Sequence, residues 1–316
     1  MTDHDQRLSR HRGALLGLAV GDALGTTVEF ARPGTFRPVT DMVGGGPFRL
    51  KPGQWTDDTS MALCLAASLI ERRGFDPADQ MQRYLRWRDA GYLSSNGRCF
   101  DIGNTVSDAL RRFERSGDPY SGSTDPHTAG NGSLMRLAPV AMAFAHDPEG
   151  AVRYAAEMSR TTHGAAEAVD ACRYYCGLLV GALNGAAKAD LLAPRFAPLP
   201  GLWDREPLAP AIDEVAGGSF LHREPPEIAG LGYVVKSLEA ALWALARGDS
   251  FEGCVLKAVN LGHDADTTGA ICGMLAGAIY GVDAIPARWR LQLAKVERIE
   301  RFARELARES AAHPRA

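Results

Sequence analysis

Glycine spaced every fourth residue is the feature that most restricts how this chain can fold. Three such rows occur, at Gly13, Gly17, Gly21 and Gly25, at Gly269, Gly273, Gly277 and Gly281, and at Gly177, Gly181 and Gly185. Residues four apart share one face of an α-helix, so each row predicts a helix with a face that lacks side chains. Each glycine costs a helix up to about 1 kcal/mol relative to alanine. We therefore expect these rows where helices pack closely against one another.

The surroundings of the rows favour a globular protein over a membrane protein. Polar and charged residues interrupt them, and no apolar stretch reaches the roughly 18 residues that a membrane span needs. Of the 316 residues, 46% are hydrophobic and 23% are charged, which is ordinary for a globular protein with a large core. The net charge is −3 without a Lys/Arg run, so no nucleic-acid-binding patch is expected.

The chain is expected to be one cytoplasmic domain. Nothing in it resembles a linker, so we predict a single domain over residues 1–316 with a core of about 10–307. The first twelve residues are polar and carry both signs of charge, unlike a signal or transit peptide. The six cysteines mostly lie in apolar helical segments, as free thiols do in a reducing compartment.

Apolar residues recur at intervals of three and four along most of the chain, which predicts an all-α fold. The expected helices are 10–24, 57–73, 77–90, 104–115, 133–145, 148–160, 165–184, 233–247, 251–260, 267–280 and 287–307. Residues 31–53, 116–132 and 193–230 are loop-like, and the last is long enough to be a functional loop or lid.

Two acidic clusters stand immediately before predicted helices. The first is Thr56-Asp57-Asp58, and the second runs from Asp264 through Asp266 to Thr267. Each alone is explained by helix capping, because acids and threonines are favoured at helix N-termini. Two such clusters of similar composition are harder to explain by capping, since a helix cap needs only one acid and neighbouring carboxylates repel each other. Converging carboxylate and hydroxyl oxygens instead suit hard cations such as Mg²⁺ or Mn²⁺.

Several other segments have the form of a ligand-binding turn. A Gly-rich turn at residues 130–136 leads into a predicted helix, where amides and Ser133 could hold phosphate oxygens. Residues 101–105 have the same form. Short glycine motifs are weak signals, and an ordinary turn is the simpler explanation of each. His163 alone is more often a structural residue than a ligand contact.

Taken together, these segments resemble the ADP-ribosylglycohydrolase family, and most closely its bacterial dinitrogenase-reductase-activating branch. The similarity runs in order from about residue 13 to about residue 299. Its pieces are residues 17–25 with Glu29, 50–54, Thr56-Asp57-Asp58, 101–105, 129–132 with Met135-Arg136, Thr162-His163, and 264–270. The paired acid motifs are the most specific of these.

The resemblance implies a compact orthogonal helical bundle with a dinuclear Mg²⁺ or Mn²⁺ centre in a central cleft. Carried onto this sequence, one ion is held by Thr56, Asp57 and Asp58, and the other by Asp264, Asp266 and Thr267, with Asp266 as the bridge. The implied catalytic residues are Asp57, Asp58, Asp266 and Glu29, and the implied substrate-binding residues are Gly103, Asn131, Gly132, Ser133, Leu134 and His163. The resemblance leaves Glu29 open as a ligand, a gate or a base.

The activity implied is metal-dependent removal of ADP-ribose from a modified protein, by cleavage of the N-glycosidic bond to arginine. The target would be dinitrogenase reductase if the closest branch applies, and free ADP-ribose would be the product. Alternatives are hydrolysis of serine-linked ADP-ribose or of a small ADP-ribosylated compound, and a non-catalytic ADP-ribose-binding relative. The acid clusters alone would also allow a two-metal phosphoester hydrolase, whose product would be AMP or phosphate.

Overall fold

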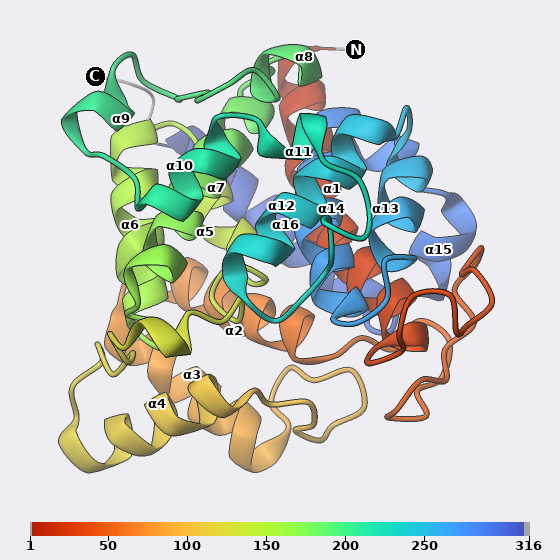
Figure 1. The fold of residues 1–316 in the computed structure, drawn as a ribbon. Coiled ribbons are helices and arrows are strands. Elements are labelled where there is room, and N and C mark those ends of the chain that lie inside the picture. Colours follow the sequence, from red (N-terminus) through yellow and green to blue (C-terminus); the bar gives the residue numbers. More distant parts are fainter. Residues whose placement is uncertain (1, 313–316) are drawn as a thin grey trace.

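The structure is a computed structural model that describes residues 2–312, and it confirms the all-α prediction (Figure 1). No strand longer than an isolated bridge occurs among these residues. The helices are α1 (Asp3–Gly25), α2 (Asp57–Arg72), α3 (Pro77–Ala90), α4 (Asn104–Ser116), α5 (Ala138–Ala143), α6 (Pro148–Arg160), α7 (Ala166–Leu183), α8 (Lys188–Leu191), α9 (Leu202–Arg205), α10 (Pro210–Ala216), α11 (Ser219–His222), α12 (Val234–Arg247), α13 (Phe251–Val259), α14 (Ala265–Tyr280), α15 (Ala287–Gln292) and α16 (Val296–Ala312).

The centre of the fold is an antiparallel pair formed by α1 and α14 (Figure 1). A Cβ atom added to Gly17 would lie 2.2 Å from the carbonyl oxygen of Gly273, and one added to Gly21 would lie 2.0 Å from that of Gly269. The two backbones therefore touch, and no other residue type fits at these positions without moving a helix. This contact confirms the close packing that the first two glycine rows predict.

The third glycine row packs differently. Gly177 and Gly181 lie on α7, and added Cβ atoms would approach Pro198 at 2.9 Å and Phe196 at 2.6 Å. These neighbours are side chains of the segment that follows α8. The third row therefore packs against side chains and not against a second helix backbone.

Two predicted helices are wrong in part. In the stretch predicted as 133–145, only Ala138–Ala143 is α-helical. Pro139 explains the late start, because proline cannot donate to a preceding turn and therefore fits only in the first turn of a helix. The stretch 287–307 divides into α15 and α16. Ala294, at the break, donates to the carbonyl of Gly53, and Lys295 is left-handed at φ 56°.

Two further differences concern the ends and loops. Helix α1 begins at Asp3, well before residue 10, because Thr2 and Asp5 form a reciprocal capping box. The segment 193–230 holds three short helices, α9 to α11. No helix in the described part of the chain is long and apolar enough to cross a membrane.

Candidate active site

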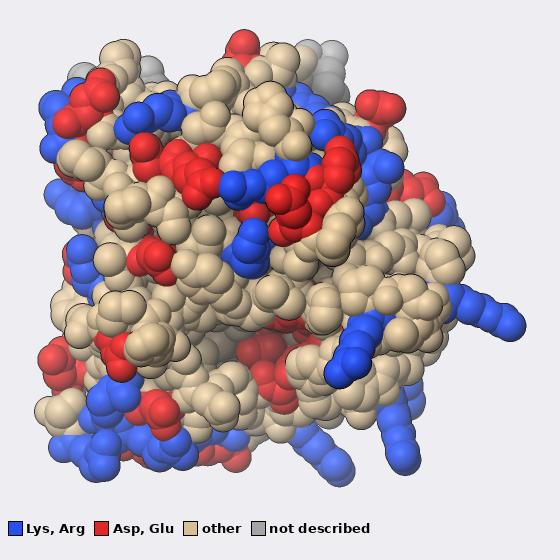
Figure 2. Space-filling view, viewed as in Figure 1, with Lys and Arg blue, Asp and Glu red and all other residues tan. Residues whose placement is uncertain are grey.

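A cavity of about 780 Å³ opens where the segment after α1 and the starts of α2 and α14 meet the turns before α4 and α5. Figure 2 shows it as a hollow with acidic side chains inside. Its lining includes Glu29, Phe30, Phe48, Asp57, Asp101, Ile102, Gly103, Asn104, Gly130, Asn131, Gly132, Met135, His163, His263, Asp264, Asp266 and Thr267. The cavity thus joins most of the segments that the sequence singles out.

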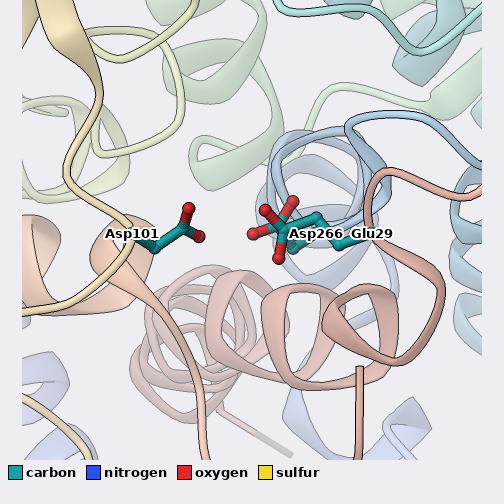
Figure 3. Close-up of side chains that lie close together, drawn as sticks. All are labelled: Glu29, Asp101 and Asp266. Atoms are coloured by element: carbon teal, nitrogen blue, oxygen red, sulfur yellow. The ribbon is translucent and has the colours of Figure 1, made fainter. Parts of the chain in front are cut away.

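Three carboxylates in the cavity lie close enough together to bind one metal ion. Glu29, Asp101 and Asp266 each offer an oxygen within 4.8 Å of the others (Figure 3). Asp266 lies in the first turn of α14, Glu29 follows the short η1 turn (Thr26–Val28), and Asp101 precedes α4. Sequence reasoning placed Asp101 in a turn but did not single it out as a potential metal ligand. Its only signal was an acid directly before a glycine-containing turn.

The acids of this site lack partners that would balance their charge. Glu29 Oε2, Asp58 Oδ1 and Asp266 Oδ1 are buried without a hydrogen-bond partner. Burial, reinforced by repulsion from Asp101, raises the pKa of Glu29 to about 10. Burial and repulsion also raise the pKa of Asp58 and Asp266 well above the usual range. Unpaired buried carboxylate oxygens are costly unless a cation compensates them, so the donor set fits hard divalent ions.

The acids of α2 are free for such a role because another residue caps this helix. Asp22, fully buried on α1, accepts from the backbone N–H of Thr56 at 2.8 Å and from that of Thr59 at 3.0 Å. Thr56 itself makes no side-chain cap. The capping explanation of the first acidic cluster is therefore wrong for Asp57 and Asp58. Sequence reasoning gave Asp22 no role, since nothing local shows which helix it would cap.

Hydroxyl groups join the two acidic clusters. The hydroxyl oxygen of Thr56 lies 3.2 Å from Asp58 Oδ2 and 3.1 Å from Asp266 Oδ2. Thr267 Oγ1 lies 3.5 Å from the same oxygen of Asp58. The starts of α2 and α14, more than 200 residues apart in sequence, thus converge as the predicted ligand sets require.

Asp264 lies on another part of the cavity wall. Its Oδ2 accepts from the side-chain amide of Asn131 at 2.7 Å. The structure thus connects Asp264 to the Gly-rich turn and does not include it in the three-acid group of Glu29, Asp101 and Asp266.

The Gly-rich turn contributes only some of its predicted residues. Asn131 and Gly132 line the cavity, whereas Ser133 and Leu134 do not. Ser133 Oγ instead lies 2.8 Å from Ser159 Oγ, and Leu134 is fully buried. These two side chains do not reach the cavity, which leaves only their backbone groups for a ligand.

Three cavity residues hold the left-handed backbone conformation although none is glycine. Phe30 and Asp101 have φ 60°, and His263 has φ 57°. Phe30 donates its N–H to the carbonyl of His263 at 2.6 Å, which joins the segment after Glu29 to the one before Asp264. Such strained residues concentrate at functional sites, where the surrounding structure holds them in place.

The fold, the paired acid clusters and the glycine turn together define one class of protein. The ADP-ribosylglycohydrolase family model matches residues 3–315, and the chain belongs to this family. A solved structure titled "ADP-ribosylglycohydrolase-related protein complex" is 49% identical and superposes with a TM-score of 0.85, over 97% of this chain and 99% of that one.

Two curated relatives are similar over nearly the whole chain. ADP-ribosylarginine hydrolase Tri1 of Pseudomonas putida (strain GB-1) is 45% identical, over 96% of this chain and 79% of the relative. ADP-ribosyl-[dinitrogen reductase] glycohydrolase of Rhodospirillum rubrum is 38% identical, over 93% of this chain and 92% of the relative. The family resemblance inferred from the motifs is confirmed.

Proposed function

We propose that this chain is an ADP-ribosylarginine hydrolase, which removes ADP-ribose from an arginine side chain of a modified protein. The observation that carries the proposal is its near full-length similarity to two relatives, one named for arginine-linked ADP-ribose and the other for ADP-ribosylated dinitrogen reductase. The acid-lined cavity of about 780 Å³ supports the proposal, since a cavity of this volume can hold a ligand as large as ADP-ribose. The proposed substrate is an ADP-ribosylated protein such as dinitrogenase reductase, and the product is ADP-ribose.

Two divalent cations, Mg²⁺ or Mn²⁺, are proposed to be held by Thr56, Asp57, Asp58, Asp264, Asp266 and Thr267. The buried, unpartnered oxygens of Asp58 and Asp266 support this assignment. Asp101 is a further candidate because of its place beside Asp266. When bound, the ions would neutralise the acids and fix the ribose hydroxyls and a water molecule.

The side chains of the cavity would carry the remaining work. In the reaction, the bond between ribose C1 and the guanidine nitrogen breaks and a water oxygen adds at C1. In the transition state between bond cleavage and water addition, positive charge develops on the sugar. The carboxylates of Asp57, Asp58 and Asp266 would stabilise this charge. Glu29 would take the proton of the water on its unpartnered Oε2 once bound cations offset the burial and repulsion that raise its pKa. Gly103, the turn at Asn131 and Gly132, and His163 would hold the diphosphate.

The decisive experiment offers the protein arginine-linked and serine-linked ADP-ribose separately and identifies the products by mass. We expect free ADP-ribose from the arginine-linked substrate. AMP would indicate a phosphoester hydrolase instead, release only from serine would indicate the other linkage, and binding without release would indicate a non-catalytic relative. EDTA should abolish turnover, with Mg²⁺ or Mn²⁺ restoring it and Zn²⁺ failing to do so.

Asp266→Asn tests the site at the level of metal binding. Without metal the variant should be at least as stable as the wild type, because it removes a carboxyl group whose ionisation burial and the neighbouring acids oppose. It should nevertheless lose both turnover and the rise in melting temperature that Mg²⁺ or Mn²⁺ gives the wild type. A variant that retains that rise would contradict the assignment of Asp266.

Glu29→Gln separates catalysis from binding. The amide keeps the shape of the side chain but cannot act as a base, so the single-turnover rate should fall by about 100-fold or more, while ADP-ribose affinity changes little. Equal losses of rate and affinity would leave Glu29 only a binding role.

A further inference from the structure

Arg136 is a buried cation without a carboxylate partner. Its side chain is fully buried, and within residues 2–312 its guanidinium donates only to carbonyl and hydroxyl oxygens. Its Nη1 donates to the carbonyl of Gly132 at 2.6 Å, and its Nη2 donates to the hydroxyl of Thr162 at 2.7 Å. The guanidinium thus connects the Gly-rich turn to the turn that contains His163.

The contact with Arg136 fixes the direction of the next hydrogen bond. A guanidinium can only donate, so the hydroxyl oxygen of Thr162 must accept from it. That hydroxyl also lies 2.8 Å from Nδ1 of His163. Its own proton needs an acceptor, and among the described residues Nδ1 is the acceptor within reach. Thr162 then donates to Nδ1, which must be unprotonated.

The imidazole of His163 is neutral and closely held. Burial, together with the charge of Arg136, lowers the pKa of His163 to about 3. Because Nδ1 is unprotonated, the single N–H proton of the neutral ring lies on Nε2. A Cβ atom on Gly130 would lie 3.4 Å from Nε2, and one on Gly132 would lie 2.8 Å from Cε1. The ring therefore packs against the Gly-rich turn at the cavity wall, where a side chain in place of either glycine would crowd it.

We propose that Arg136 is a positioning residue which, through Thr162, holds His163 as the Nε2–H tautomer and so presents a fixed hydrogen-bond donor to an anionic ligand oxygen. The ligand group is a diphosphate, a step that rests on the proposed function. Within residues 2–312, no Lys or Arg side chain lines this cavity. Apart from the proposed cations, the protein can therefore offer the anion only neutral donors and backbone amides. A histidine that is held in one tautomer always offers its Nε2–H to the ligand, so no binding free energy is spent on selecting that tautomer.

The tautomer is measured directly by ¹⁵N NMR of the histidine rings in the wild-type protein, with His163→Asn identifying the signals. We expect Nε2 to carry the proton and Nδ1 to show the shift of a hydrogen-bond acceptor. A proton on Nδ1 would overturn the proposal. This measurement needs no turnover, so a protein that showed the expected tautomer but failed to cleave ADP-ribosylarginine would refute only the proposed function.

Affinity for ADP-ribose tests the consequence. Thr162→Val removes the hydroxyl at nearly constant volume and should weaken ADP-ribose binding about tenfold, as expected for a hydrogen bond to a charged group. Adenosine, which lacks the diphosphate, should bind the variant as it binds the wild type. Thr162→Ser should restore both the NMR signature and the affinity.

The matched control is Thr161→Val, the neighbouring buried threonine. Its hydroxyl donates to the carbonyl of Met158 at 2.7 Å. It also accepts from Nε2 of Gln80 at 3.1 Å and from Nη2 of Arg136 at 3.4 Å, but no hydrogen bond of the described residues joins it to the imidazole. The variant should leave the tautomer and the ADP-ribose affinity unchanged. Equal losses from the two threonine variants, or an equal loss of adenosine binding in Thr162→Val, would reduce the role of Thr162 to stability and overturn the proposal.

Discussion

The α1–α14 contact and the α7 glycine row share one sequence pattern but are packed in different ways. Between α1 and α14, each glycine faces a backbone, as Gly13 does at 2.0 Å from the carbonyl oxygen of Gly277. On α7, Gly181 faces the ring of Phe196 and the end of Leu191. The spacing predicts a close contact on one face of the helix, but it does not show whether the neighbour can move. A backbone cannot move without its helix, whereas a side chain can change its rotamer.

The two regions also differ in what lies at their ends. A Cβ atom on Gly25 would lie 2.3 Å from the carbonyl oxygen of Ala265 and 2.5 Å from Cα of Asp266. The α1–α14 contact therefore continues into the acid site. No glycine of the α7 row, and neither Phe196 nor Pro198, lines the cavity. Damage to the first region should reach the chemistry, and damage to the second should not.

The largest effect is expected from Gly273→Leu. The leucine would have to separate two touching backbones, at a cost of about 4 kcal/mol or more in the free energy of unfolding. Urea unfolding monitored by circular dichroism measures this cost. A fall in melting temperature of only a degree would show that the face is not packed as described.

Gly25→Ala should combine a loss of stability, about 3 kcal/mol, with a loss of function. The added methyl group displaces the start of α14 and with it Asp266, so the stabilisation by Mn²⁺ should largely disappear. Gly13→Ala is the matched control, because it meets the same kind of backbone contact at the far end of the pair. It should destabilise to a similar degree and keep the response to metal. Equal loss of that response in both variants would show that the whole contact, rather than its acid end, governs the site.

Gly181→Ala should cost about 1–2 kcal/mol, because Phe196 can swing away at the expense of packing. Turnover per folded molecule should not change. Reduced turnover at full folding, measured with ADP-ribosylarginine, would show that α7 is coupled to the cavity after all.

The smallest effect is expected from Gly177→Ala. Its Cβ would meet Pro198 at 2.9 Å, on a loop that can yield. The gain in helix propensity, up to about 1 kcal/mol, offsets this contact, so the free energy of unfolding should stay within about 1 kcal/mol of the wild type. A loss as large as that of Gly25→Ala would remove the distinction between the two rows.

Helical periodicity predicted most of this fold, because an apolar face reports burial directly. It failed where one residue or a distant contact decided the outcome. Pro139 delays the start of the helix predicted for 133–145, and the bond from Ala294 to Gly53 interrupts the helix predicted for 287–307. Neither partner of that bond could be inferred from its own neighbourhood.

The site was predictable where its residues form a motif and unpredictable where they depend on tertiary contacts. The acids at the starts of α2 and α14 stand beside threonines in a repeated arrangement, so they stood out. Asp101 joins Glu29 and Asp266 only through the path of the chain. Ser133 and Leu134 belong to the turn motif, yet their side chains point into the core, since local sequence does not fix which side of a turn faces a cavity.

The cap that Asp22 places on α2 also bears on the order of folding. A helix usually carries its own N-terminal cap, so its first turn can form before other contacts do. The cap of α2 comes from a residue 34 positions earlier than Thr56, on a different helix. The first turn of α2 can become stable only after α1 has docked, and the two acids of that turn gain their final positions late in folding. An isolated α2 segment should therefore fray at the end that carries the proposed metal ligands.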